Sequence, residues 1–150
     1  MKALLVIDIQ QSYISRYDHE LIQRINKRIT EVHESNWDIV YIRNTKRLRN
    51  RVVTEGLSDE LVLLSENVFF KEEANAFASA ELLSLLHAKH IYELEIIGVD
   101  GNLCVKASAR GALECGFAVT VSEACIGIIN HARFDKTKRL LEELGVIFRQ

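Results

Sequence analysis

The 150-residue sequence contains no proline, and its apolar runs are short. The absence of proline fits a chain built mostly of regular elements joined by short turns. The longest runs, Leu4 to Ile7 and Leu94 to Val99, are broken by charges well before the roughly 18 residues that a membrane span needs. The apolar run before Asp8 is also too short for a signal peptide. We therefore expect a cytoplasmic protein that contacts no membrane.

The sequence also has no large excess of positive or negative charge. Lysine and arginine number 19 against 21 acidic residues, so the net charge is −2 and nothing in it favours a nucleic-acid partner. A hydrophobic fraction of 48% with 27% charged residues is typical of a soluble globular domain. The odd set of three cysteines, Cys104, Cys115 and Cys125, has no metal-ligand spacing. No disulfide framework is expected, and at least one thiol should be free.

The residues after the first apolar run exclude two classes of α/β protein, the dinucleotide-binding domains and the phosphoacceptor receiver domains. The segment Gln10-Gln11-Ser12 has none of the glycines that a dinucleotide-binding turn requires. A phosphoacceptor receiver domain needs an acidic pair there and an acceptor aspartate after the third strand, where this sequence has Asp8-Ile9-Gln10 and Lys71. Neither class fits the chain.

Apolar periodicity predicts strands that alternate with helices. The predicted strands are 3–9, 37–43, 67–70, 93–99, 117–121 and 146–148. The predicted helices are 21–32, 57–64, 79–90, 103–115 and 130–144, and residues 44–56 are predicted to form a polar, basic loop. This order favours a parallel sheet with crossover helices on both faces. We expect one domain over residues 1–150, an α/β fold with three α/β/α layers and a six-stranded, mostly parallel, Rossmann-like sheet.

Chemistry-bearing side chains follow several of these strands. In an open parallel sheet, ligands bind outside the carboxyl ends of the strands. Asp8 ends the first predicted strand, Asn44 follows the second, Lys71 the third and Cys104 the fourth, while Glu123 follows the fifth. A carboxylate, an amine and a thiol are thus predicted to collect at one edge, although they are far apart in sequence.

The thiol of Cys104 has a distinctive setting. It lies in the first turn of its predicted helix, after Asp100-Gly101-Asn102, where free N–H groups and the helix dipole favour negative charge. In such a setting a thiol pKa falls from about 8.5 to ~3.5–7.5. A nearby lysine would strengthen the effect, and a carboxylate could accept the proton. The alternative is a buried structural cysteine, with Asp8 and Lys71 as a purely structural ion pair.

Three segments of the sequence resemble the isochorismatase-like cysteine hydrolase family. Ala3-Leu-Leu-Val-Ile-Asp-Ile-Gln10 resembles the opening strand of that family, and Phe70-Lys71 with Asn75-Ala76-Phe77 resembles its lysine segment. Gly98-Val-Asp-Gly-Asn-Leu-Cys-Val105 resembles its nucleophile turn. The resemblance spans nearly the whole chain and implies the isochorismatase-like hydrolase fold.

The resemblance also implies roles for individual residues. Asp8 would be the general base, Lys71 would stabilise the thiolate, and Cys104 would attack the substrate to form a covalent intermediate. The peptide bond entering Gly101 would be cis, and the N–H groups of Gly101 and Cys104 would form the oxyanion hole. The candidate substrate-binding residues around them are Gln10, Tyr13, Asn44, Phe77, Asp100 and Asn102. Core packing explains Tyr13 and Phe77 equally well.

The expected function is hydrolysis of a small molecule, at an amide-type C–N bond, without a cofactor. The alternative is an inactive homologue that binds a small molecule or a partner. Nicotinamidases of the family carry an Asp-x-His pair and a further histidine for a metal after the second strand, and this chain has neither there, so no metal is expected. Lys46, Arg47, Arg49 and Arg51 could steer an anionic substrate or form a solvated loop. By analogy with the family, a homo-oligomer is expected, as a dimer or tetramer.

Overall fold

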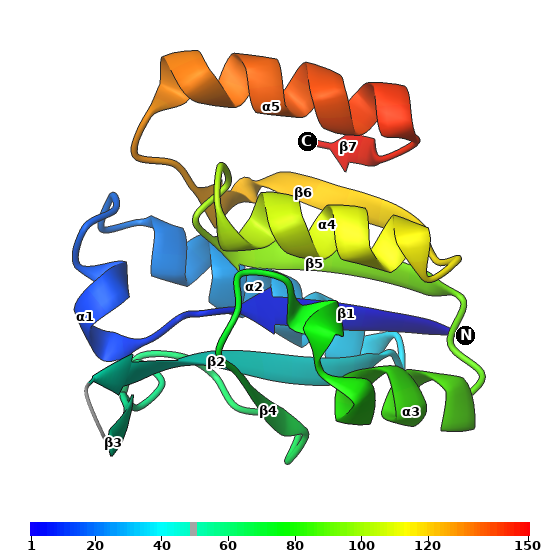
Figure 1. The fold of residues 1–150 in the computed structure, drawn as a ribbon, viewed down its shortest axis with the longest axis horizontal. Helices are drawn as coiled ribbons and strands as arrows, with labels where there is room; N and C mark the ends of the chain where they lie inside the picture. The colour runs from blue at the N-terminus through cyan, green and yellow to red at the C-terminus, as the bar shows by residue number, and fades with distance from the viewer. Residues whose placement is uncertain (49–50) are drawn as a thin grey trace.

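The structure, a computed structural model, describes residues 1–48 and 51–150. Figure 1 shows a central sheet between layers of helices, which is the expected α/β/α arrangement. The strands are β1 (Lys2–Ile7), β2 (Asp38–Leu48), β3 (Arg51–Thr54), β4 (Val68–Lys71), β5 (Glu93–Val99), β6 (Ala118–Gly127) and β7 (Ile147–Arg149).

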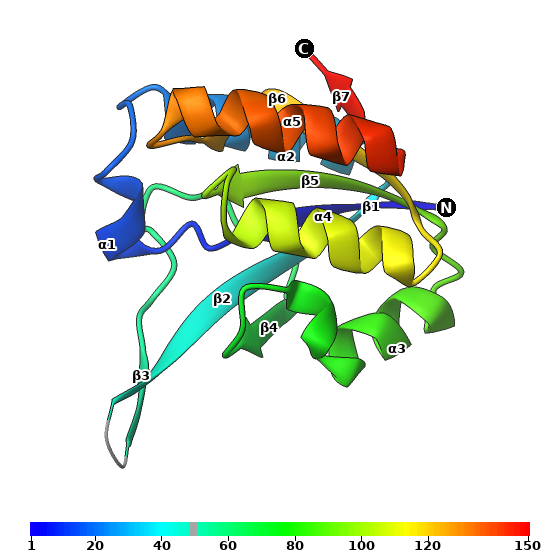
Figure 2. The same ribbon diagram turned by 45° about the horizontal axis from the view of Figure 1, so that its top comes forward.

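Six strands form one parallel sheet in the order β4–β2–β1–β5–β6–β7. The central strands β1 and β5 carry near-continuous apolar runs because both faces of the sheet are covered there. The seventh strand, β3, pairs antiparallel with the last residues of β2. Figure 2 shows this β2–β3 pair extending away from the helical layers.

Helices cover the two faces unequally. They are α1 (Gln11–Ile14), α2 (Leu21–Glu34), the 3-10 turn η1 (Ala76–Ala78), α3 (Ala80–Ala88), α4 (Cys104–Glu114) and α5 (His131–Leu144). The apolar stripe of α2 packs on one face of the sheet, whereas α3, α4 and α5 pack on the other (Figure 2). None of the helices in residues 1–48 and 51–150 is long and apolar enough to cross a membrane.

The ends of α5 are those that the sequence predicts. Asn130 accepts the N–H of Arg133 through its side-chain oxygen at 2.9 Å and so caps the first turn. Gly145 ends the helix with a φ of +112°, in the left-handed region that favours glycine. The helix predicted over 130–144 is confirmed.

Two predicted elements are wrong. Within 44–56, β2 continues to Leu48 and then pairs with β3, where a loop was predicted. Residues 57–64 are not helical, because side chains outside the segment bind its backbone groups. The side chain of Asn26 bonds the carbonyl of Glu60 and the N–H of Val62, and the hydroxyl of Tyr41 accepts the N–H of Leu64.

The fifth predicted strand is longer than the sequence indicates. It continues as β6 to Gly127, with a shift of its register against β5 between Ile96 and Gly98. Glu123 therefore lies within the strand, where its carboxylate binds the amine of Lys138 on α5 at 3.0 Å. It is part of an ion pair between sheet and helix rather than a free group after the strand.

Candidate active site

Asp8 sits where the chain leaves β1. Its φ of +54° turns the backbone out of the strand, in a region that aspartate tolerates better than most residues. Its N–H still donates to the carbonyl of Ile42 at 3.0 Å. On the other side, Gly98 of β5 lies so close that an added Cβ would be 2.1 Å from the oxygen of Ile7. The carboxylate is therefore held at a tight, buried end of the central strand pair.

Lys71 joins the predicted acid and thiol. Its amine lies 3.0 Å from Oδ2 of Asp8 and 3.3 Å from Sγ of Cys104. A third acceptor, Oδ1 of Asn44, lies 3.4 Å away. An ammonium group has three N–H donors, and here each has a partner. The structure thus brings together the carboxylate, the amine and the thiol that the sequence placed at the carboxyl ends of three separate strands.

The position of Lys71 is fixed by its strand. β4 pairs with β2 so that Lys71 stands opposite Asn44, and the hydroxyl of Thr45 donates to the carbonyl of Lys71 at 3.2 Å. The side chain of Lys71 is only 2% exposed, as is that of Asp8. Burial on this scale raises the cost of an unpaired charge, which explains why the two opposite charges lie in contact.

Burial also shifts two acidic groups of the site. The pKa of Asp8 is raised above its usual range by desolvation, which outweighs the opposing effect of Lys71. The pKa of the Cys104 thiol is raised to about 11, first by burial and then by the Asp8 carboxylate, against the smaller effect of Lys71. This direction is opposite to the lowered thiol pKa expected from the helix terminus. The resting site therefore favours a protonated thiol beside a carboxylate that has become a better proton acceptor.

The turn before Cys104 differs in one respect from what the sequence led us to expect. The cis peptide bond joins Val99 to Asp100, one residue earlier than the expected bond entering Gly101. The N–H of Gly101 donates to the carbonyl of Gly127 at 2.8 Å, because the chain continues the β5–β6 pairing by one more bond. The predicted oxyanion role of Gly101 is therefore not supported by its geometry. The N–H of Cys104, at the first position of α4, belongs to the helix-terminal donors that have no intrahelical acceptor.

Asp100 ties the turn to two other segments. Its Oδ2 accepts hydrogen bonds from the hydroxyl of Tyr17 and from the N–H of Ile129, both at 3.1 Å. Its Oδ1 accepts the N–H of Asn102 at 2.8 Å. Partial burial raises the pKa of the Tyr17 hydroxyl, and the neighbouring Asp100 carboxylate raises it further. Asp100 thus fixes the turn that carries the thiol.

Asn102 turns away from the thiol toward α5. Its amide donates to the carbonyl of Asn130 at 3.0 Å and accepts from the hydroxyl of Thr137 at 2.8 Å. Both bonds anchor the turn to α5 and its preceding loop. Asn102 therefore helps to hold the turn, and it is not among the residues that line the cavity beside the thiol.

A cavity of about 210 Å³ opens beside the thiol. It is lined by Asp8, Tyr13, Arg16, Tyr17, Asn44, Val99, Asp100, Leu103 and Cys104. Three of the six candidate substrate contacts, Tyr13, Asn44 and Asp100, are among these residues. Gln10 is not, because its side chain is bonded to the backbone of Asn44 at 2.7 and 3.1 Å. Phe77 packs against Phe117 in the core, with ring centres 5.6 Å apart.

Four lining residues were not predicted as site residues from the sequence, namely Arg16, Tyr17, Val99 and Leu103. The first two follow α1 at the carboxyl end of β1, so the rule that ligands bind at strand ends could have found them. Leu103 is 56% exposed although it is apolar and adjacent to the thiol. The side chains of the basic cluster, Lys46, Arg47, Arg49 and Arg51, lie outside the described part of the structure.

The site offers no ligand set for a metal. In the described residues, no group of three or more His, Cys, Asp or Glu side chains is arranged to hold an ion. The site residues are one carboxylate, one thiol and one amine, and the amine is already paired with the carboxylate. The donor set does not fit a catalytic zinc, which needs three protein ligands.

Fold and site together define an α/β domain that carries a buried acid and amine and a half-buried thiol at the carboxyl edge of its parallel sheet. The family follows from comparison with known proteins. The model of the isochorismatase domain matches residues 2–147, and the chain therefore belongs to the isochorismatase family.

Curated relatives of the chain include hydrolases. The streptothricin hydrolase of Streptomyces noursei is 28% identical over 145 residues, which cover 90% of this chain and 51% of that protein. The chain thus spans about half the length of that relative. The maleamate amidohydrolase of Pseudomonas putida is 36% identical over 62 residues, 41% of this chain and 29% of that protein.

A solved structure supports the same fold. The nicotinamidase of Staphylococcus aureus superposes with a TM-score of 0.82 at 25% identity, covering 99% of this chain and 97% of that one. The near-complete coverage in both directions means that the structure shares its whole architecture with that protein.

Proposed function

We propose that this chain is a hydrolase that cleaves a C–N bond of a small amide through a covalent intermediate on Cys104. The observation that carries the proposal is the position of one amine, Lys71 Nζ, 3.0 Å from the Asp8 carboxylate and 3.3 Å from the Cys104 sulfur. The names of the relatives, a streptothricin hydrolase and a maleamate amidohydrolase, support hydrolysis of this kind of bond.

The first half-reaction would acylate the thiol. Sγ of Cys104 attacks the amide carbon while its proton passes to Asp8, whose raised pKa suits it as an acceptor. The N–H of Cys104 faces the developing oxyanion, and the amine of Lys71 offsets negative charge on the sulfur as it loses its proton. The C–N bond then breaks, and the leaving nitrogen takes the proton from Asp8 and departs as an amine or ammonia.

The second half-reaction would release the acid. Water attacks the thioester carbon and gives its proton to Asp8, the C–S bond breaks, and the sulfur recovers that proton. The products are a carboxylic acid and the free enzyme. No step uses a metal or a cofactor, and each proton moves between groups that line the cavity.

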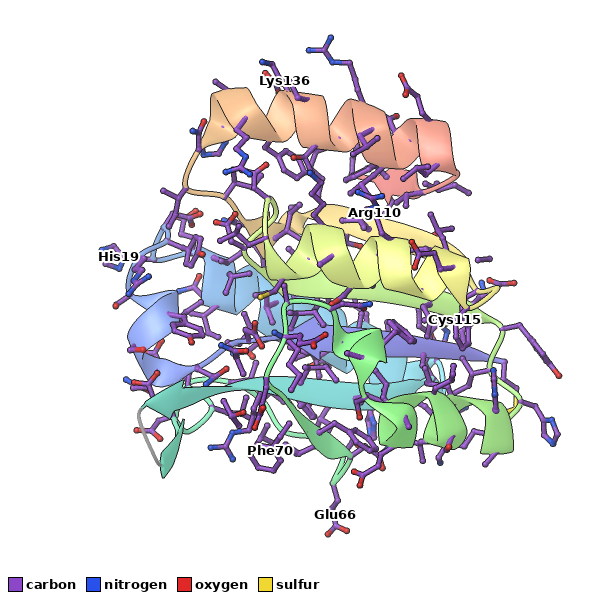
Figure 3. All side chains as sticks on the ribbon, viewed as in Figure 1. His19, Glu66, Phe70, Arg110, Cys115 and Lys136 are labelled. Carbon is purple, nitrogen blue, oxygen red and sulfur yellow. The ribbon has the colours of Figure 1, made fainter. Side chains whose placement is uncertain are left out.

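The test is ammonia release from a panel of short amides, together with intact-mass spectrometry to detect an acyl adduct. We expect turnover that is lost in Cys104→Ser and retained in Cys115→Ser. Cys115 is a matched control because it lies at the far end of α4 and is also an unpaired thiol (Figure 3). Turnover in Cys104→Ser would overturn the mechanism. If no amide gives ammonia or an adduct, the chain is instead the non-catalytic binding module.

Location and assembly are part of the same proposal. We infer a cytoplasmic enzyme, supported by three cysteines that are all unpaired in the structure. By analogy with the family we infer a homo-oligomer, a dimer or a tetramer. Light scattering on a gel-filtered sample measures the assembly directly, and a monomer at micromolar concentration would contradict it.

A further inference from the structure

Arg16 is a cavity residue that the proposed chemistry does not use. Two carboxylates line the cavity, and both are engaged: Asp8 by the amine of Lys71, and Asp100 by three hydrogen bonds. In contrast, no ion pair joins the guanidinium of Arg16 to an acid of residues 1–48 and 51–150. The undescribed positions add no acid, because the sequence from 46 to 54 contains neither Asp nor Glu. The cavity therefore has a cation with N–H donors to offer.

The backbone that carries Arg16 is held in place. The N–H of Arg16 donates to the carbonyl of Tyr13 at 3.1 Å, and that of Tyr17 donates to the carbonyl of Ile14 at 3.2 Å. The next side chain, Tyr17, is fixed by its hydroxyl on Asp100. The guanidinium itself lies 5.9 Å from the ring centre of Tyr13, within the range of a cation–π contact.

Gly127 allows the ring of Tyr17 to pack closely against the end of β6. A Cβ added to Gly127 would lie 2.5 Å from the ring of Tyr17, so the ring packs directly on the strand end. The segment from Tyr13 to Tyr17 is thus pinned at both ends around an exposed arginine. An arginine on a fixed backbone loses less freedom when it binds a ligand than one on a free loop.

We propose that Arg16 binds a carboxylate of the substrate, and hence that the enzyme acts on short amides that carry a carboxylate. This inference rests on the proposed amide hydrolysis. The planar guanidinium presents paired N–H donors that match the two oxygens of a carboxylate. Val99 and Leu103 supply the apolar part of the wall, which suits the short carbon chain between the two functional groups.

The size of the cavity limits the substrate. Its 210 Å³ lies below the roughly 300–1,000 Å³ of pockets that hold drug-sized ligands. Arg16 and Cys104 line this same small space, so only a few carbon atoms can separate the carboxylate from the amide. Hydrolysis of such an amide yields a short dicarboxylate and ammonia. Dicarboxylates are therefore product ligands, and their binding can be measured without turnover.

The first experiment measures binding. Malonate, succinate and glutarate are titrated against the alkylation of Cys104 by iodoacetamide, followed by mass spectrometry, with butanamide as the neutral comparison. We expect at least one dicarboxylate to protect Cys104 but not Cys115. The required concentration should rise about 10- to 100-fold in Arg16→Gln, the range typical of a lost hydrogen bond to a charged group. The concentration that Arg16→Lys requires should lie between those of the wild type and Arg16→Gln. Lysine keeps the positive charge but lacks the paired N–H donors of the guanidinium.

The matched control is Arg110→Gln. Arg110 is an exposed arginine on α4 that does not line the cavity (Figure 3). This variant should bind dicarboxylates as the wild type does. Inorganic phosphate is tested in the same protection experiment, because arginine also binds phosphate. Protection by phosphate as strong as that by the best dicarboxylate would overturn the assignment to a carboxylate.

The second experiment compares KM for malonamate, succinamate and glutaramate with KM for neutral amides of equal length. We expect Arg16→Gln to raise KM for the anionic amides and to leave neutral amides unchanged. Equal binding and equal KM in wild type and Arg16→Gln, or no protection by any dicarboxylate, would overturn the inference even if amides are hydrolysed. Protection that depends on Arg16 without turnover of any amide would leave the subsite standing and remove the proposed hydrolysis.

Discussion

Two buried carboxylates on the central strand pair, Asp8 after β1 and Glu95 within β5, have different surroundings. Glu95 is 3% exposed, and both of its oxygens are bound. Arg28 holds them from α2 at 2.7 and 2.8 Å, and Arg149 adds a contact of 3.4 Å. Asp8 is equally buried, yet only its Oδ2 is bound by Lys71, and its Oδ1 has no hydrogen-bond partner in the described residues.

The difference separates a structural ion pair from a reactive one. A carboxylate with both oxygens bound by a planar guanidinium is stabilised as an anion and has little reason to take up a proton. A buried carboxylate with one oxygen free, a single amine partner and a thiol beside it has a raised pKa and a proton donor within reach. Burial alone therefore does not distinguish the proposed base from a structural carboxylate. The number and kind of its partners do.

The largest effect is expected from Asp8→Asn. Asparagine has nearly the same shape but cannot accept the thiol proton, so kcat/KM for the amide should fall by about 10²–10⁴. The measurement is the rate of ammonia release by protein whose unfolding curve shows that it is folded. Asp18→Asn is the control, since Asp18 is an exposed acid far from the thiol in sequence. An Asp8→Asn enzyme with more than a tenth of normal activity would exclude Asp8 as the base.

Glu95→Gln should have the opposite profile, with a loss of stability and normal activity per folded molecule. The substitution removes the more buried of the two carboxylates that bind Arg28, whose side chain is 16% exposed, and leaves it only Glu31. This loss should cost about 2–3 kcal/mol of unfolding free energy. The value is below that of a fully buried pair because Arg28 and Arg149 retain contact with water. Urea unfolding measures it. A stability loss below about 0.5 kcal/mol, the lower end of typical mutational effects, would remove the structural role.

The alternation of apolar runs was sufficient to predict the parallel sheet and the edge at which Asp8, Lys71 and Cys104 meet. It was sufficient because strand ends in a parallel sheet share one edge, whatever the separation in sequence. The same reasoning failed for 57–64, whose apolar spacing suits a helix. There the side chains of Asn26 on α2 and Tyr41 on β2 bond the backbone groups that a helix would have paired internally. Local periodicity holds no information about such distant partners.

The direction of the thiol pKa shift could not be predicted from the sequence either. Proximity of Cys104 to a helix start predicted a lowered pKa, but the direction depends on the burial of the site and on the carboxylate that lies beside the sulfur. Asp100 and Asn102 were named as candidate substrate contacts, and nothing in the sequence indicated the hydrogen bonds by which both also hold the turn. These contacts join residues that are distant in sequence. Arg16 was overlooked for a different reason, because the strand-end rule could have found it but was not applied to the residues after α1.

The smallest effect is expected in the pH dependence of thiol alkylation, which separates the two carboxylates without any substrate. The wild-type rate for Cys104 should rise with pH toward a midpoint near the thiol pKa of about 11, because only the thiolate reacts. Asp8→Asn removes a carboxylate that raises this pKa, so its midpoint should be lower. Lys71→Met removes the cation that lowers it, so its midpoint should be higher. Glu95→Gln should match the wild type, since Glu95 is bound by Arg28 and does not line the cavity. A midpoint that moves with Glu95→Gln as far as with Asp8→Asn would show that the thiol responds to buried charge in general, and the distinction between the two carboxylates would be lost.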